Sequence, residues 1–414
     1  MRRTIVWGAI FLVVFLASKL FMHGPPWPSE DYVMDGSEGP LNAFLQQVLG
    51  HWVPTDFQSD YVSAKALLAG NDPYQRGEVM FPVYGAPSWG FDVANPHPPT
   101  MVALTIPFAL LEYQSAITAW SVLMIFVLIW TFSLMGVPRS VSIAAGLGVA
   151  ITFPGAYAIG NAVPLIGLGI ALAHRFRDNP MIAGLGLTMA ATPKSSGLLL
   201  ALPFLLSARR LTVAWAALLT AIVAIAPLAF YPDVWHRYVA AGLDAIRAVQ
   251  ARPDNASILH LAATWGLPQL VVMLSLTLVT LLLVLGTRNT YWPTVWLMVA
   301  ALPISWTYSM LTLIPIYCMC VKRRTFWSIA SVVIGAGLVV ACPPWGLWPT
   351  YVVPIVLLMA ALAVWQIRDS SFWLDGRLTD GVRRRGRRPD GAGAPPDAAE
   401  MPKTDAATDR LPMG

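Results

Sequence analysis

Long apolar runs alternate with short polar connections along most of this chain. The first run covers about residues 4–22, and the next one begins only at about residue 98. Later runs follow closely, at about 98–111, 115–136, 140–157, 160–174, 181–193, 195–207, 211–231, 268–287, 291–303, 305–320, 325–342 and 347–366. Several reach the length of about 20 residues that crosses a bilayer core about 30 Å thick. Because backbone polar groups in lipid must be paired internally, we expect these runs to be helices.

The longest polar segment, about residues 23–97, separates the first two runs and is rich in Pro, Trp, Asp and Tyr. Two pieces of it have helical patterns, at about 41–50 and about 57–69. The second piece places several side chains on one face at helical spacing: Tyr61, Ala64, Leu67 and Leu68. This pattern predicts an amphipathic helix that lies in the membrane interface.

Basic residues predict how the chain is oriented, because cytoplasmic connections are enriched in Lys and Arg. They occupy alternate connections: Arg175 and Arg177, Arg209 and Arg210, Arg288, and Lys322 to Arg324. The N-terminus, Met1-Arg2-Arg3 followed by an apolar stretch without a small-residue cleavage site, predicts an uncleaved signal anchor that starts in the cytoplasm. The basic tail, 371–414, is also expected to be cytoplasmic, and its composition predicts disorder.

Two cytoplasmic termini require an even number of crossings, whereas the pattern contains thirteen apolar runs. We interpret the short run 98–111 as re-entrant or tilted. The prediction is an all-α polytopic membrane protein with about twelve transmembrane helices in one domain, residues 1–370. The connections that then face outward include 23–97, about 158–160, about 194, and 232–267. Chemistry on the outer face must be assembled from these connections and the adjoining helix ends.

The composition agrees with a membrane protein and excludes several other classes. Hydrophobic residues make up 56% of the chain and charged residues only 12%, against roughly 25% charged in soluble proteins. The net charge of +5 is explained by the basic connections rather than by a nucleic-acid surface. Cys318, Cys320 and Cys342 all lie in apolar runs, so we expect no disulfide framework and no metal site. Neither a Walker motif nor a GxGxxG turn is present, and no cofactor is expected.

The first outer connection contains two carboxylates that are candidates for chemistry, Asp56 and Asp60. A carboxylate where the chain meets the membrane surface can act as a general base if it is both ionised and accessible. Asp56 also lies just before the predicted helix, where an acid favours capping and suits the helix dipole. The local pattern leaves both roles open for Asp56, with Asp60 as the second candidate for the base.

Two basic side chains also lie in outward connections, one at the end of the first connection and one in the connection near residue 194. His97, within Asn95-Pro96-His97-Pro98-Pro99, could bind phosphate, shuttle protons, or simply lie at the surface. Lys194 is the only charge between Asp178 and Arg209. An ionisable group at membrane depth indicates a function, such as holding a lipid phosphate, and the alternative is a lysine that extends to the interface.

Two further motifs have simpler explanations. Asn71-Asp72-Pro73-Tyr74 is a turn by composition. Asn255-Ala256-Ser257, in the second outer connection, formally matches a glycosylation sequon, which is a short and weak pattern.

Taken in order, these residues resemble glycosyltransferase family 87, a bacterial family of GT-C membrane enzymes. The resemblance covers about residues 1–370 and rests on the order and spacing of several short motifs rather than on any single one. These are Asp56-Phe57 with Tyr61, Ala64 to Gly70, Pro73-Tyr74, Pro98-Pro99, Gly160-Asn161, Lys194 before Leu198-Leu199-Leu200, Arg209-Arg210, and Asn255 with Ser257. Two departures are Asn161, where many members have Gln, and His97, in a segment where many have Tyr-x-Pro-Pro.

The family includes polyprenol-phosphate-mannose-dependent mannosyltransferases and an arabinofuranosyltransferase. The resemblance therefore implies a GT-C-like helix bundle with a large first extracytoplasmic loop in the plasma membrane. It implies transfer of mannose or arabinofuranose from a polyprenyl-phosphate donor to an envelope glycolipid or polysaccharide on the outer face. Asp56 is then the catalytic base, with Asp60 as runner-up. Substrate contacts are expected from the following residues: Lys194, His97, Tyr61, Asn161, Asn255 and Ser257.

Two other functions fit a chain with many spans. A transporter or lipid flippase usually shows internal repeats and broken spans that line a midplane site, and we find no convincing repeat. A polymerase or ligase of envelope polysaccharide also has many spans and a large outer loop. The position of the strongest polar cluster separates an enzyme from a transporter, because an enzyme of this kind needs its cluster at the outer face.

Overall fold

The structure of the chain is a computed structural model. It describes residues 40–49, 56–87, 93–250, 252, 255–305, 307–322, 325–341, 348–367, 369 and 372. The chain divides into two units, Met1–Leu374 and Asp375–Gly414, and every described residue belongs to the first. Within the described residues all regular elements are helices and no strand occurs, which confirms the all-α prediction. The predicted signal anchor and the predicted tail lie outside these residues, apart from Phe372.

Each apolar run from residue 98 onward contains helix. Three helices of the described part are long and apolar enough to cross a membrane: α6 (Tyr113–Leu134), α12 (Arg210–Ile225) with its continuation η2 (Ala226–Ala229), and α16 (Gln269–Thr287). The other runs form shorter helices: α5 (Pro99–Ala109), α7 (Arg139–Ile151), α8 (Phe153–Ile159), α9 (Val163–Arg175), α10 (Pro180–Ala191), η1 (Ser195–Leu200), α11 (Ala201–Leu206), α17 (Tyr291–Ala300), η4 (Thr307–Leu313), α18 (Ile314–Val321), α19 (Phe326–Ala341) and α20 (Trp348–Gln366). The count of about twelve spanning helices stays a prediction.

Prolines explain why several runs are divided or shortened. A proline is tolerated in the first turn of a helix, because the N–H that it lacks would have no helical partner there. At an interior position it breaks the helix, so a helix that approaches a proline usually ends before it. A proline lies in the first turn of α5, α8, α9, α10, η2 and α18. As a result the run 140–157 breaks at Thr152, and the run 305–320 becomes η4 followed by α18.

Both predicted outer loops contain helices. In the first loop α2 (Pro40–Val48) and α3 (Asp56–Leu68) confirm the two predicted pieces, and α4 (Gly77–Tyr84) is an additional helix. The second loop, for which the sequence analysis named no helices, folds into short ones: α13 (Val234–Arg237), the π-helical turn η3 (Tyr238–Gly242), α14 (Leu243–Gln250) and α15 (Ile258–Thr264).

Helix α3 is buried on several sides, so the prediction of an interfacial amphipathic helix is wrong. It packs against α4 and α5, and the Phe57 ring lies 5.3 Å from the Trp120 ring of α6, centroid to centroid. Its buried residues include polar as well as apolar side chains: Phe57, Gln58, Asp60, Tyr61, Val62, Ser63, Ala64, Ala66 and Leu67. The apolar side chains of α3 do occur at helical spacing, but other parts of the chain also cover the opposite face of this helix.

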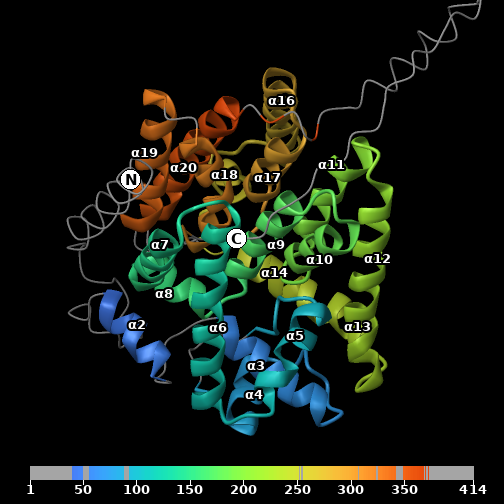
Figure 1. Ribbon diagram of the computed structural model, residues 1–414. Helices are drawn as coiled ribbons and strands as arrows, with labels where there is room; N and C mark the ends of the chain where they lie inside the picture. Colours follow the sequence, from blue (N-terminus) through green and yellow to red (C-terminus); the bar gives the residue numbers. More distant parts are fainter. Residues whose placement is uncertain are drawn as a thin grey trace, which may run out of the picture. The chain divides into compact units, whose positions relative to one another are not determined.

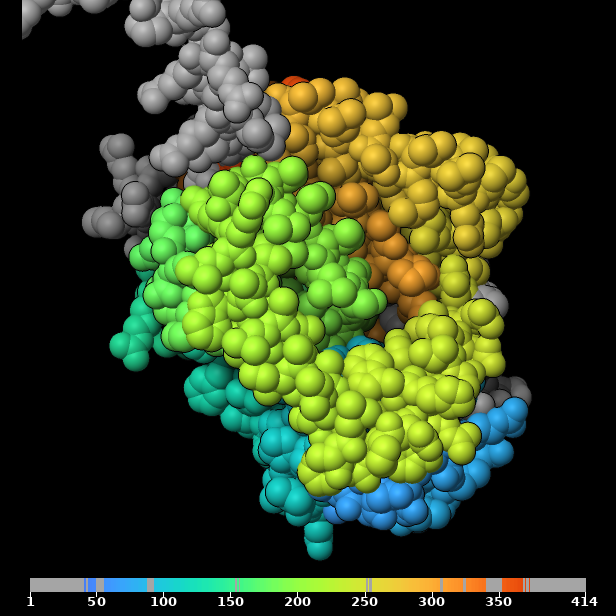
Figure 2. Space-filling view, turned by 90° about the vertical axis from the view of Figure 1, so that its right-hand side faces the viewer, coloured from blue at the N-terminus to red at the C-terminus, as the bar shows by residue number. Residues whose placement is uncertain are grey.

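Several helices of the two outer loops lie at one end of the first unit. Figure 1 shows α3, α4 and α5 together at this end, near α13, while α6 and α12 lead away from it. The space-filling view shows a hollow between the green segment that includes α11 and the golden segment that includes α16 (Figure 2). The polar groups described next come from the elements around α3, α5 and α10.

Candidate active site

The first residues of α3 are held in place by the segment Gly160-Asn161. The backbone N–H of Phe57 donates to the Gly160 carbonyl over 3.0 Å. The Asn161 side-chain amide donates to Oδ2 of Asp56, and the Tyr308 hydroxyl donates to the same oxygen over 3.4 Å. The carboxylate also suits the positive end of the helix dipole in the first turn of α3. The Asp56 side chain is 22% exposed, so it is oriented by the protein and still accessible.

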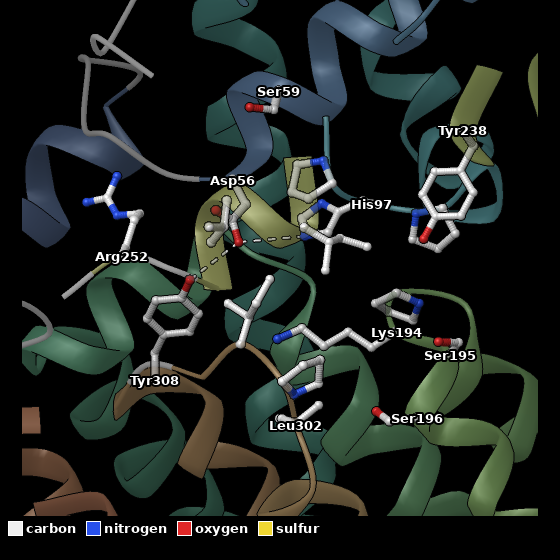
Figure 3. Close-up of a pocket in the computed structure, with 17 residues that line it drawn as sticks. Asp56, Ser59, His97, Lys194, Ser195, Ser196, Tyr238, Arg252, Leu302 and Tyr308 are labelled. Carbon is white, nitrogen blue, oxygen red and sulfur yellow. Dashed lines mark hydrogen bonds and ion pairs between the residues drawn. The ribbon is translucent and has the colours of Figure 1, made fainter. Parts of the chain in front are cut away.

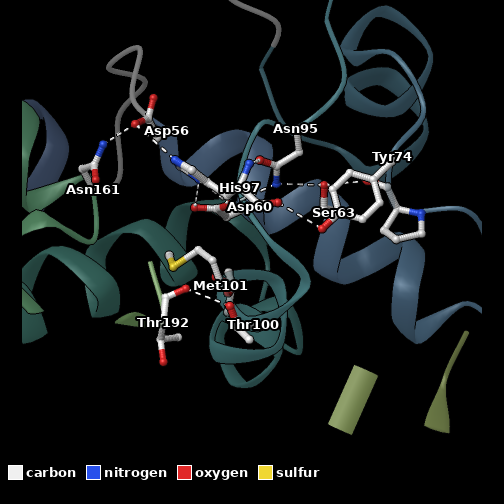
Figure 4. A network of polar contacts seen from close by, with 12 residues as sticks. Asp56, Asp60, Ser63, Tyr74, Asn95, His97, Thr100, Met101, Asn161 and Thr192 are labelled. Atoms are coloured by element: carbon white, nitrogen blue, oxygen red, sulfur yellow. Dashed lines mark hydrogen bonds and ion pairs between the residues drawn. The ribbon is translucent and has the colours of Figure 1, made fainter. Parts of the chain in front are cut away.

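One helical turn further along α3, Asp60 lies behind His97 and is almost fully buried, with 1% of its side chain exposed. His97 Nδ1 lies 2.9 Å from Oδ1 and 3.1 Å from Oδ2 of Asp60. The other ring nitrogen of His97, Nε2, lies 3.8 Å from Oδ2 of Asp56. The imidazole therefore lies between two carboxylates of the same helix (Figure 4).

The backbone around His97 is fixed by its own hydrogen bonds. Asn95 accepts a bond from the His97 N–H over 2.9 Å and donates from its amide to Asp60 over 3.0 Å and to Ser63 over 3.1 Å. The Tyr74 hydroxyl donates to the His97 carbonyl over 3.0 Å. Asp72 accepts from the Tyr74 N–H over 2.9 Å, which makes Asn71–Tyr74 the predicted turn.

Lys194 lies between α10 and η1, in contact with the same region. The Thr100 hydroxyl, in the first turn of α5, donates to the Thr192 carbonyl over 2.8 Å and so joins the His97 segment to the Lys194 segment. A side chain at Gly197 would place its Cβ 2.2 Å from the Ala190 carbonyl oxygen, so this glycine lets η1 fold back onto α10. Burial lowers the pKa of the Lys194 ammonium below its usual value, and the nearby Asp56 carboxylate opposes that shift.

Asp56, His97 and Lys194 line one cavity of about 150 Å³ (Figure 3). Its wall also carries hydroxyl and basic groups from distant parts of the chain: Ser59, Ser195, Ser196, Tyr238, Arg252 and Tyr308. The cavity thus combines one accessible carboxylate with several cationic groups. Such a site suits removal of a proton from one reactant beside a group that develops negative charge.

Several predicted substrate contacts have protein partners instead of a place on this wall. Tyr61 is buried among aromatic rings, and its hydroxyl donates to the Leu111 carbonyl over 2.8 Å. Asn255 is fully buried, with its amide donating to the Pro303 carbonyl over 3.0 Å, and Ser257 donates to the same oxygen over 3.0 Å. Since Pro303 lies on the cavity wall, Asn255 and Ser257 support the wall rather than face the cavity. Burial of Asn255 also leaves no room for a glycan at the formal sequon.

Tyr308, Arg252 and Tyr238 were missed by the sequence analysis, although all three line the cavity. Arg252 carried a usable signal, because a basic residue in an outward connection runs against the charge bias of membrane proteins. The two tyrosines carried none that separates them from the many interfacial aromatics. Among the described residues, no three His, Cys, Asp or Glu side chains gather as a possible metal site.

Comparison with protein families gives a direct result. The sequence model of glycosyltransferase family 87 matches residues 96–313, which make up more than half of the chain. The chain belongs to glycosyltransferase family 87 and is a membrane glycosyltransferase, as the sequence motifs suggested. The searches of curated proteins and of solved structures found no match. The matched region contains His97 and Lys194 but begins after Asp56 and Asp60, so the case for these two aspartates rests on the local structure.

Proposed function

We propose that this chain transfers a sugar from a polyprenyl-phosphate donor to a glycolipid or polysaccharide acceptor of the cell envelope. The observation that carries the proposal is the joint position of Asp56, His97 and Lys194 on one cavity. These residues come from three separate segments, and together they supply a base and a cationic site for a leaving phosphate. The proposal assigns the catalytic domain to residues 1–370.

The site supports a single displacement in which the anomeric configuration inverts. Asp56 takes the proton from an acceptor hydroxyl while the oxygen forms its bond to the anomeric carbon of the donor. The bond between that carbon and the phosphate oxygen breaks, and its electron pair stays on the phosphate. Lys194 then stabilises the lipid phosphate that leaves, in the way that preorganised charges stabilise developing negative charge.

An apolar groove beside the cavity supports a lipid-linked donor. The groove has a volume of about 350 Å³ and is lined by α10, η1, α11 and α12 through mostly small side chains. The segment that follows Lys194 borders both spaces, since Ser195 and Ser196 line the cavity whereas Gly197 and Leu198 line the groove. A donor with its phosphate at Lys194 would have its isoprenoid chain in this groove.

The position of the polar cluster favours an enzyme over a transporter. Asp56 opens α3, His97 precedes α5, and Lys194 follows α10, so the three groups lie at helix ends rather than within helices. The connections that supply them are the ones predicted to face outward. We therefore assign the reaction to the outer face of the plasma membrane, where a lipid phosphate is the sensible carrier. Mannose and arabinofuranose are the candidate sugars by family resemblance.

The test is transfer by purified protein from labelled polyprenyl-phosphate mannose or arabinofuranose to envelope glycolipid acceptors. Asp56→Asn keeps the size of the side chain but removes the basic group, so we expect the rate to fall by at least about 10²-fold. Asp244→Asn is the control, because Asp244 is an exposed partner of Arg247 on α14. Transfer near the wild-type rate in Asp56→Asn would refute Asp56 as the base.

A further inference from the structure

The geometry points to a proton relay behind the base, in which Asp60 orients His97 and His97 takes the proton that Asp56 has removed from the acceptor. This inference rests on the proposed function, because it concerns the fate of that proton. Asp60 and His97 act through Asp56, so they are positioning residues in the sense that they need not touch the substrate.

The first step of the argument is the orientation of the imidazole. His97 Nδ1 lies within hydrogen-bond distance of both Asp60 oxygens, at 2.9 and 3.1 Å. A carboxylate accepts but does not donate, so a neutral His97 carries its hydrogen on Nδ1 and donates it to Asp60. The lone pair of Nε2 is then directed away from Asp60, and Oδ2 of Asp56 lies 3.8 Å from Nε2.

The second step concerns Asp60, whose surroundings suit it to orient His97 rather than to contact an acceptor. It is buried, with 1% of its side chain exposed. Its Oδ1 also accepts a hydrogen bond from the Asn95 amide over 3.0 Å. Asn95 in turn accepts from the His97 N–H, so one side chain fixes both members of the pair (Figure 4).

The third step concerns the charges that face the imidazole. Burial alone would lower the pKa of His97, but the charge and hydrogen bond of Asp60 and the charge of Asp56 raise it, and Lys194 opposes them. The net effect is a pKa above the usual value for histidine. The other titratable groups nearby are Tyr74, which bonds to the His97 carbonyl, and the cavity residues Tyr238, Arg252 and Tyr308.

The protons balance as follows. The acceptor hydroxyl loses its proton to Asp56 while its oxygen bonds to the sugar, and the leaving phosphate keeps the electron pair of the broken bond. An aspartic acid is ordinarily a stronger acid than an imidazolium by about 2.6 pH units, so the proton passes to Nε2 of His97. The imidazolium is held between two carboxylates and releases one proton per turnover to water in the cavity. Asp56 is thereby restored as a carboxylate.

This relay predicts a pH dependence whose sign separates it from a cationic role for His97. A relay requires neutral His97, so kcat/KM rises with pH through the raised pKa of the imidazole. A His97 that binds the donor phosphate must be protonated, so kcat/KM would fall over the same range. Lys194 must stay charged in either case, which adds a falling limb at higher pH.

The experiment measures kcat/KM against pH for the wild type, Asp60→Asn and His97→Asn, with His236→Asn as the control because His236 is exposed on α13. We expect a rising inflection above the usual pKa of histidine in the wild type and the control. In Asp60→Asn this inflection should move to lower pH, because the side chain at position 60 is then neutral and no longer raises the pKa of His97. In His97→Asn it should disappear, with kcat lower by roughly 10-fold, less than the loss expected for the base itself.

Titration of the imidazole by nitrogen NMR in lipid nanodiscs gives a second reading that does not depend on activity. The His97 signal, assigned by its loss in His97→Asn, should titrate at lower pH in Asp60→Asn. If the wild type is active but its kcat/KM falls or stays constant as the pH rises through this range, the relay is wrong while the proposed function stands. The same holds if His97 titrates at the same pH in Asp60→Asn as in the wild type. A folded wild type that transfers no sugar from any polyprenyl-phosphate donor would overturn the proposed function, and the relay with it.

Discussion

Two aspartates one turn apart on α3 have different surroundings, and this difference favours Asp56 over Asp60 as the proposed base. Asp56 is 22% exposed and lies on the cavity wall, whereas Asp60 is 1% exposed and contacts His97 and Asn95. An acceptor hydroxyl in the cavity could approach Asp56 but would have to displace His97 to reach Asp60. The family resemblance ranked Asp56 first, but the local sequence pattern could not distinguish the two, because the burial of Asp60 depends on how the segment around Asn95 folds.

Lys194 supports a prediction about the donor. Removal of its ammonium in Lys194→Met takes away a charge-assisted contact worth roughly 1.5–3 kcal/mol, which corresponds to about 10- to 150-fold in affinity. We expect the KM for the lipid-phosphate donor to rise by that factor while the KM for the acceptor changes little. Steady-state kinetics with each substrate varied in turn measures both values.

The matched control for this prediction is Lys322→Met, because Lys322 is an exposed lysine after α18 that does not line the cavity. It should leave both KM values near those of the wild type. Unchanged donor affinity in a folded Lys194→Met protein would leave extension to the interface as the only role of this lysine.

At the scale of the elements, the sequence predicted where helices occur but not how they are covered. Apolar length marked every helix from α5 onward except those of the second outer loop, and prolines explain the breaks. The side chains of α3 were misjudged because periodic spacing identifies one apolar face and says nothing about what covers the other. Gln58, Asp60 and Ser63 are buried polar residues of α3, and only their partners in three dimensions reveal that. The helices of the second outer loop escaped notice because each is short.

The groove along α12 supports a second prediction about the donor. Ala217 lines the groove, and Ala217→Phe would place a ring in the space proposed for the isoprenoid chain. We expect the KM for a long-chain donor to rise by only about 3- to 10-fold, because the surrounding lipid is as apolar as the groove. Kinetics with donors of different chain length measures this effect.

Two controls distinguish an occupied groove from a general disturbance of α12. A donor whose chain is too short to enter the groove should be transferred equally well by Ala217→Phe and by the wild type. Leu218→Phe changes the next residue, which is 50% exposed and does not line the groove, and it should leave both donors unaffected. An equal loss with short and long chains would contradict the proposed path of the lipid.

At the scale of the whole first unit, connections predicted to be cytoplasmic meet one another away from the cavity. Arg209, after α11, lies 3.2 Å from Asp178, after α9, and its guanidinium lies 4.9 Å from the centre of the Phe372 ring. His174 of α9 lies 2.9 Å from Asp369. The chain beyond α20 therefore meets the ends of α9 and α11, as expected if these connections share one side of the membrane.

The orientation of the molecule is the last prediction, and it follows from this separation of the two polar regions. Gln75, exposed in the turn before α4, should face outward, and Arg175, exposed at the end of α9, should face the cytoplasm. Gln75→Cys and Arg175→Cys are introduced singly into a background in which Cys318, Cys320 and Cys342 are alanine, and that background is the control. A thiol reagent that does not cross membranes should label Gln75→Cys in intact cells and should label Arg175→Cys only after permeabilisation. The opposite pattern would place the cavity on the cytoplasmic side, where a lipid-phosphate donor would lose its advantage over a nucleotide sugar.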